Sequence, residues 1–166
     1  MSGVPLGEVE QKEIVRRCWY SHDGHWFTSA VAELGMAAAN RLNRRALRAQ
    51  GVTEARRLRK ALGLKEVGSV SDFLGLFDAL ASVLVPAPTE VRVAPLGERS
   101  YEICVDRCFV HETVVRAGNP EAYECAVFDR IAGWHEGAGL PLDEEPPGRR
   151  CVKAMGGECR RVLALR

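Results

Sequence analysis

Residues 84–106, LVPAPTEVRVAPLGERSYEICVD, contain the point at which the pattern of the chain changes. Before Pro86, apolar residues recur at helical spacing, and after Thr89 they alternate with polar ones, as in strands with one buried face. The alternating apolar positions, on either side of a Pro-Leu-Gly turn, are Val91, Val93, Tyr101, Ile103 and Val105. We therefore expect helices before Pro86 and a mostly antiparallel sheet after it.

The residues before Pro86 predict four or five helices with short connections. Residues 26–34 carry apolar side chains at i, i+4 and i+8, and Gly35 suits the position just past a helix end. Residues 36–50 and 52–62 repeat this plan, each followed by a glycine that we interpret as a stop. Ser69 and Asp72 then have the spacing of a capping box. The helix that they begin should bury Phe73, Phe77, Leu80 and Leu84.

The second half predicts one long helix between two hairpins. Asn119 and Pro120 suit the N-cap and first position of that helix. Its core stripe would be Tyr123, Val127, Ile131 and Trp134. Within residues 149–165, the pair Gly156-Gly157 predicts a tight hairpin. The expected fold is α+β and a single domain over residues 1–166. A helical N-terminal layer (about 8–85) packs on a small antiparallel sheet of about four strands (about 90–166).

Composition narrows the function classes. The net charge of +1 gives no whole-molecule attraction to nucleic acid or membrane. Residues 1–20 hold no apolar run long enough for a signal peptide or a membrane span, so we expect a cytoplasmic protein. Its six cysteines should then be thiols. Residues 41–65 hold nine Lys or Arg and one acid, but no aromatic residue for base stacking. A solvated basic helix face is the favoured interpretation, and a nucleic-acid binder is the alternative.

The stretch CVDRCFVHE, residues 104–112, contains two cysteines, a histidine and an acid. Cys108 ends the predicted strand just before a short helix, where the helix dipole and free N–H groups lower a thiol pKa. Cys108 is therefore a candidate nucleophile, and Cys125 a second catalytic candidate. The alternative is that Cys104 and Cys108 are buried structural thiols.

A metal site is a further hypothesis for these cysteines. Cys108 and His111, together with Cys125 and Cys159, supply soft ligands suited to a zinc or iron ion. The predicted hairpin places Cys151 on the opposite sheet face from Cys159, and so outside this site. We expect Cys108, Cys125 and Cys159 to meet at a pocket that Asp23 or His22 also reaches.

The stretch WYSHDGHWF, residues 19–27, is the other chemically dense segment. A carboxylate and an imidazole among aromatic rings have shifted pKa values and can serve general acid–base catalysis. Asp23 and His22 are accordingly catalytic candidates. The alternative is that Trp19, Trp26 and Phe27 belong to the core and that His22 only borders it.

The order of these segments resembles a known family. The resemblance rests on HDGHWF, the glycine-stopped run after it, RCFVHE, YEC entering a helix, and a terminal cysteine hairpin. Together they resemble the L-2-amino-thiazoline-4-carboxylic acid hydrolase-like family and related uncharacterised cytosolic proteins. The resemblance implies hydrolytic opening of a small cyclic amidine in a cysteine-rich pocket. A non-catalytic metal-, cofactor- or small-ligand-binding module is the alternative, and the sequence leaves the oligomeric state open.

Overall fold

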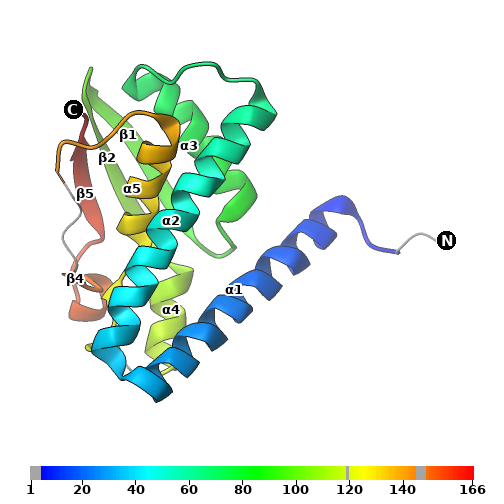
Figure 1. Cartoon of the computed structure of the whole chain (residues 1–166), viewed down its shortest axis with the longest axis vertical. Helices are drawn as coiled ribbons and strands as arrows, with labels where there is room; N and C mark the ends of the chain where they lie inside the picture. Colours follow the sequence, from blue (N-terminus) through cyan, green and yellow to red (C-terminus); the bar gives the residue numbers. More distant parts are fainter. Residues whose placement is uncertain (1–4, 119, 145–148) are drawn as a thin grey trace.

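The computed structural model of the chain describes residues 5–118, 120–144 and 149–166, and it has the expected α+β class (Figure 1). The helices are α1 (Glu8–Leu34), α2 (Met36–Leu62), α3 (Val70–Leu84), α4 (Phe109–Arg116), α5 (Val127–Ala138) and the 3₁₀-helix η1 (Lys153–Met155). The strands are β1 (Glu90–Gly97), β2 (Ser100–Arg107), β3 (Glu124–Cys125), β4 (Arg149–Arg150) and β5 (Arg160–Ala164). Among the described residues, no helix combines the length and apolar character that a membrane span requires.

The sheet is antiparallel, as predicted. Its three strands lie in the order β1-β2-β5, and β3 pairs separately with β4, where about four strands were expected in one sheet. The predicted alternation on β2 holds, because Tyr101, Ile103 and Val105 are all buried. The turn between β1 and β2 falls on Glu98 and Arg99, so that the Pro-Leu-Gly segment belongs to β1. Proline is tolerated there because β1 is an edge strand.

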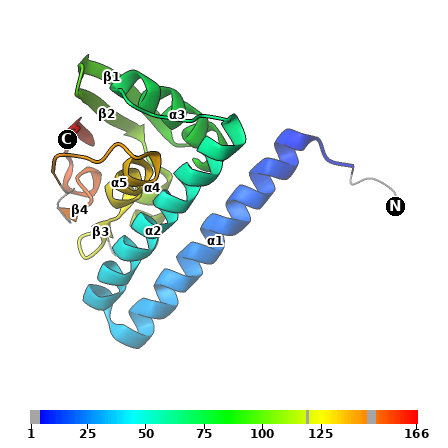
Figure 2. The same cartoon turned by 45° about the horizontal axis from the view of Figure 1, so that its top comes forward.

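Helix α2 runs through Gly51, where we had predicted a helix stop. Gly51 is buried against α5, and a Cβ on it would lie 2.2 Å from the carbonyl oxygen of Arg130. A Cβ on Gly133 would likewise lie 2.2 Å from the carbonyl oxygen of Arg48. These two glycines therefore permit a close crossing of α2 and α5, which lie side by side in Figures 1 and 2. Gly35 and Gly63, at φ of 78° and 67°, do end helices as predicted.

The crossing of α2 and α5 also contains a buried charge network. Glu54 accepts hydrogen bonds from Arg130 at 2.6 and 2.8 Å and from the indole nitrogen of Trp134 at 2.7 Å. Its carboxylate is thus fully paired, as a buried charge must be. His135, one residue on, is completely buried and stacks on Phe73 at 3.6 Å between ring centroids. His135 is therefore a core residue.

Helix α3 follows its sequence closely. Ser69 accepts a hydrogen bond from the backbone of Asp72 at 3.1 Å, and the Asp72 carboxylate accepts one from the backbone of Ser69 at 3.1 Å. The predicted capping box is therefore confirmed. The core includes Phe73, Phe77 and Leu80, whereas Leu84 is half-buried.

The last third of the chain departs from the prediction in two places. Helix α5 begins at Val127, so the predicted start at Pro120 was wrong, and Asn119 lies outside the described residues. Cys125 consequently lies in β3 and not in a helix. The glycine pair does not form a hairpin turn, because η1 precedes it and Gly156 is the left-handed residue that ends η1. β4 pairs with β3, and β5 pairs with β2.

Helix α1 packs loosely on the rest of the protein. Its N-terminal end points away from the body in both views (Figures 1 and 2). Ala30 is the one buried residue of α1, and Trp26 is 65% exposed. The interpretation of Trp26 as core is thus wrong, whereas Phe27 packs edge-on against Tyr123.

Candidate functional site

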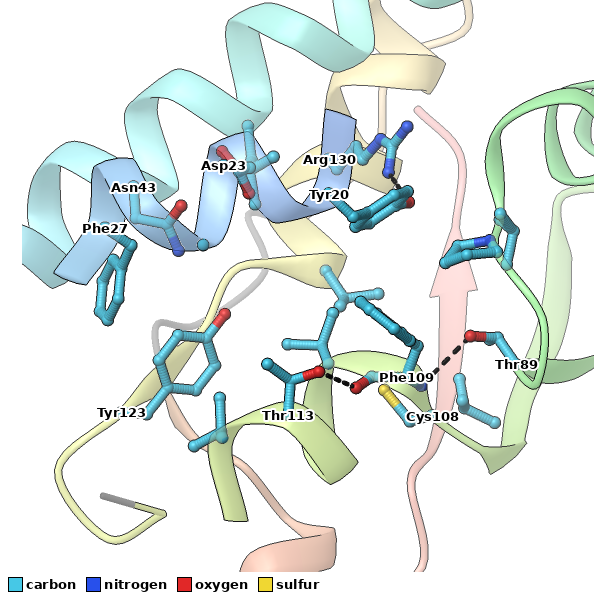
Figure 3. A pocket seen from close by; sticks show the side chains of 18 of the residues that line it. Tyr20, Asp23, Phe27, Asn43, Thr89, Cys108, Phe109, Thr113, Tyr123 and Arg130 are labelled. Atoms are coloured by element: carbon cyan, nitrogen blue, oxygen red, sulfur yellow. Dashed lines mark hydrogen bonds between the residues drawn. The ribbon is translucent and has the colours of Figure 1, made fainter. Parts of the chain in front are cut away.

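A cavity of about 300 Å³ lies between α1, α4, α5 and the sheet. Apolar side chains make up most of its wall, among them Phe27, Val31, Leu47, Phe109, Val127 and Ile131. The polar groups at its surface include Tyr20, Asp23, Asn43, Thr89, Cys108, Thr113, Tyr123 and Arg130. Figure 3 shows Tyr20, Asp23 and Arg130 on one side of this space, and Cys108, Phe109 and Thr113 on the other.

Asp23 is the acid of this cavity. It makes no hydrogen bond or ion pair within the part of the chain that the structure describes. Burial raises the pKa of its carboxyl above the usual range, and the positive charges of Arg130 and His22 offset part of this rise. Asp23 is thus a half-buried acid that is easier to protonate than an ordinary aspartate.

Arg130 is already paired, although it reaches the cavity beside Asp23. Glu54 binds it through two hydrogen bonds, and its Nη1 donates to the Tyr20 hydroxyl at 2.6 Å. The Tyr20 hydroxyl in turn donates to the carbonyl of Leu84 at 3.1 Å. This network holds α1 against α5 and the end of α3. Within residues 5–118, 120–144 and 149–166, Asp23 is left without a direct counter-ion.

Cys108 lies opposite, between β2 and α4, at the N-cap position that the sequence predicted. Burial nevertheless raises the pKa of its thiol, although the backbone N–H groups of Val110 and His111 favour the thiolate. The predicted lowering of this pKa was wrong, because the loss of water outweighs the effect of a helix of eight residues. Cys108 is therefore a neutral thiol at pH 7.

The structure brings only some of the predicted site residues together. Asp23 and Cys108 line the same cavity, whereas His22 is exposed and does not line it. Cys125, Cys159 and His111 do not line it either. The structure therefore separates the expected shared pocket into two sites, the cavity with Asp23 and a cluster of cysteines. Cys108 belongs to both sites.

The second site is a group of four cysteines. Each of the six pairs formed by Cys108, Cys125, Cys151 and Cys159 interacts electrostatically. Cys151 belongs to this group, contrary to the prediction, because the hairpin that would have turned it away does not form. Its sulfur lies 3.6 Å from Nδ1 of His111. Cys104 stands apart, with its sulfur 3.5 Å from Arg92 and 3.5 Å from Asp106.

No three His, Cys, Asp or Glu side chains are arranged to hold a single metal ion, as far as the described residues show. The side chains of Cys108, Cys125, Cys159 and His111, which the sequence suggested as ligands, are thus near one another but not preformed as a metal centre. Metal binding at these residues stays a prediction.

Two residues of the cavity were not predicted from the sequence. Arg130 and Tyr20 position the wall beside Asp23, yet they are 110 positions apart in the chain. The available signal was that Arg130 stands one helical turn before Trp134 on the helix face that also carries the core stripe. An arginine on such a face needs a buried acid, and Glu54 is the one acid within residues 41–65.

The basic segment of α2 is partly used inside the protein. Arg44 forms a two-point hydrogen bond with Asp129, and Arg48 pairs with Glu136. Arg59 donates to the carbonyls of Ala138 and Lys65. Arg44, Arg48 and Arg59 thus attach α2 to α5, so this part of the segment is not simply the solvated face that we expected.

The fold and the cavity define the class of protein: an α+β domain with a largely apolar, ligand-sized space between its helices and its sheet. The chain belongs to a family of unknown function, DUF6125, whose profile matches residues 8–94. No curated protein and no solved structure matches the chain. The matched segment contains Asp23 and the α1 side of the cavity, whereas the four grouped cysteines lie outside it. The resemblance to the thiazoline-carboxylate hydrolases stays a prediction.

Proposed function

We propose that the protein binds, in the α1–α4 cavity, a small molecule with an apolar body and a positively charged N–H-donating head. A cyclic amidine is the class that fits best. The observation that carries this proposal is Asp23, an acid in a largely apolar wall that has no hydrogen-bond partner among the described residues. An amidinium presents N–H donors to both oxygens of a carboxylate, and such charge-assisted bonds are strong where water is excluded.

The size and charge of the cavity restrict the ligand further. A volume of about 300 Å³ lies at the small end of ligand sites and exceeds the needs of a lone five-membered ring. A carboxylate on the ligand would face Asp23, and Arg130 is already neutralised by Glu54. The proposed ligand is therefore an amidine with an apolar substituent, and not the small carboxylate that the family resemblance implies.

Hydrolysis of the bound amidine is the reaction that Asp23 is placed to support. In this step water adds to the amidine carbon and gives one proton to Asp23. Asp23 then returns that proton to the departing nitrogen as the C–N bond breaks. The hydroxyl proton of the tetrahedral adduct passes to the released amine, which leaves an amide and an ammonium group. A carboxyl whose pKa is raised toward neutrality is suited to both transfers. Cys108 contributes to the cavity wall as a neutral thiol, and thiolate attack is not part of this proposal.

Three probes with the same phenyl body test the binding proposal: benzamidine, benzamide and benzoate, by calorimetric titration at pH 7. Benzamidine should bind tightest and benzoate weakest. Asp23→Asn should reduce benzamidine affinity about 10- to 100-fold, the effect of a hydrogen bond to a charged group. His25→Gln is the matched control, because His25 is exposed and lies outside the cavity wall two residues from Asp23, and it should leave affinity unchanged. Equal affinity for the three probes, or a preference that survives Asp23→Asn, would contradict the proposal.

The catalytic step has its own test. 2-Phenyl-2-imidazoline, a cyclic amidine, should be converted to N-(2-aminoethyl)benzamide, detected by mass spectrometry. Turnover should be lost in Asp23→Asn and retained in Cys108→Ala. Binding without product would leave a ligand-binding module and remove the hydrolase, whereas loss of turnover in Cys108→Ala would assign the chemistry to the thiol.

A further inference from the structure

We propose that Cys108, Cys125, Cys151 and Cys159 form one four-thiolate site for a thiophilic metal, either a zinc ion or an iron–sulfur cluster. This site shares Cys108 with the wall of the α1–α4 cavity, but its argument does not depend on the proposed ligand. It differs from the set that the sequence suggested, because Cys151 takes the place of His111.

The β2–β5 pairing brings Cys108 and Cys159 to the same end of the sheet. Cys108 directly follows β2 and is the N-cap of α4. The backbone N–H of Val105, near the end of the same strand, donates to the carbonyl of Cys159 at 2.8 Å. Cys159 directly precedes β5, which pairs with β2. These two cysteines thus lie at the same end of the β2–β5 ladder.

The other two cysteines come from the short β3–β4 ladder. Cys125 pairs with Arg149, two residues before Cys151. The sulfur of Cys151 lies 3.6 Å from Nδ1 of His111, which stands in the first turn of α4, three residues after Cys108. Helix α4 also contacts η1, which follows Cys151. The β3–β4 ladder therefore meets the β2–β5 ladder at the beginning of α4.

The electrostatics agree with this geometry. Every pair among the four thiols is near enough to interact electrostatically. Four thiols in a low-dielectric space repel one another when ionised, and a soft cation is the partner that allows all four to lose their protons. Cys104 shows the contrast: it is buried too, but its sulfur contacts Arg92 and Asp106.

Metal binding requires these side chains to rearrange. The present side-chain positions hold no preformed three-ligand centre among the described residues. Rotation about χ1 moves each sulfur among three staggered positions. Four cysteines match the ligand sets of structural zinc and of iron–sulfur clusters. His111, in contact with Cys151, is then placed to donate a hydrogen bond to a bound thiolate.

Metal analysis of the full chain, purified anaerobically without chelators, tests this inference. We expect about one zinc per chain, or iron with an equal amount of acid-labile sulfide and a visible absorption band. The two results separate the zinc form from the cluster form.

Cys125→Ser and Cys151→Ser should each lower the metal content at least fivefold. The matched controls are Cys104→Ser, a buried cysteine outside the group, and Cys18→Ser, an exposed one; both should keep the wild-type content. His111→Ala should also keep it.

A cobalt titration of the wild-type chain makes the test independent of how the variants fold. Cobalt bound by four thiolates gives an intense thiolate-to-metal charge-transfer band that saturates at one equivalent. Absence of this band, together with a purified chain that contains neither zinc nor iron, would overturn the proposal. Equal metal content in wild type and Cys151→Ser would overturn the four-thiolate assignment, and loss of metal in His111→Ala would restore the ligand set expected from the sequence.

Discussion

Two helix junctions of this protein are built in opposite ways. At the crossing of α2 and α5, Gly51 and Gly133 let the backbones touch, and Glu54 is fully hydrogen-bonded. Where α1 faces α4, a cavity of about 300 Å³ stays open, and Asp23 makes no hydrogen bond or ion pair with any described residue. The closed junction satisfies every polar group of its network, and the open one leaves an acid available. Under the proposed function, one junction serves stability and the other binds the ligand.

Loss of Glu54 should have the largest effect on stability. Glu54→Ala leaves the Arg130 guanidinium and the Trp134 indole nitrogen without their acceptor, so the free energy of unfolding should fall by about 3–5 kcal/mol. Glu136→Gln is the control, because Glu136 pairs with Arg48 across the same two helices but is 51% exposed. That change should cost less than about 1 kcal/mol. Urea unfolding measures both, and equal costs would show that the network is not stabilising.

Acid should weaken the closed core through His135. The carbonyl of Leu140 can only accept, so Nδ1 donates to it at 3.0 Å, and Nε2 then accepts from the Tyr101 hydroxyl at 2.6 Å. Burial lowers the pKa of His135 to about 4. Because the unfolded chain binds this proton near pH 6.5 and the folded chain near pH 4, stability is lost as pH falls through that window. The loss should approach about 3 kcal/mol. NMR titration of the His135 ring checks the cause, and titration near pH 6.5 would contradict it.

Gly133→Ala should open the closed junction. The new methyl group would meet the Arg48 carbonyl oxygen, and overpacking of this kind costs about 1–3 kcal/mol. Gly75→Ala is the matched control, since Gly75 lies within α3 with no heavy atom near its would-be Cβ. That substitution should stabilise by about 0.5–1 kcal/mol. Thermal unfolding should therefore move in opposite directions for the two variants, and a shared direction would remove the close-crossing account.

At the open junction, Asp23→Asn should have the smallest effect on stability. Burial raises the pKa of Asp23, so the folded state disfavours its charged form, and ionisation weakens the fold as pH rises through the ordinary aspartate pKa. The amide removes this penalty. Thermal unfolding at pH 7 should show a slightly higher melting temperature, with no gain at pH 3, while benzamidine affinity falls about 10- to 100-fold. A clear loss of stability at pH 7 would assign Asp23 a structural role.

The helices and strands that local chemistry specifies were predictable. The capping box of Ser69 and Asp72 depends on residues within one helical turn, and the alternation of Tyr101, Ile103 and Val105 depends on one strand. Gly51 was misread because a glycine looks the same at a helix end and at a close crossing, and its partner, Gly133, is 82 positions away. The predicted Gly156-Gly157 hairpin was wrong for a similar reason. The residues just before the two glycines form η1, and β4 pairs with the distant strand β3.

The candidate site was predictable only in part. Asp23 and Cys108 were found because each stands out locally, and the cavity does contain both. The pKa of Cys108 was misjudged because a helix N-terminus is visible in a sequence, whereas burial by distant elements is not. Arg130 and Tyr20 were missed because their role depends on Glu54, a contact between segments far apart in the chain.

A crystal structure of the protein with benzamidine tests the central claim most directly. We predict that the phenyl ring occupies the cavity between α1 and α4, with both amidine nitrogens at about 3 Å from the Asp23 carboxylate oxygens. Arg130 should keep its hydrogen bonds to Glu54 and Tyr20. Benzamidine bound outside the cavity, or bound within it with the amidine directed away from Asp23, would contradict the account.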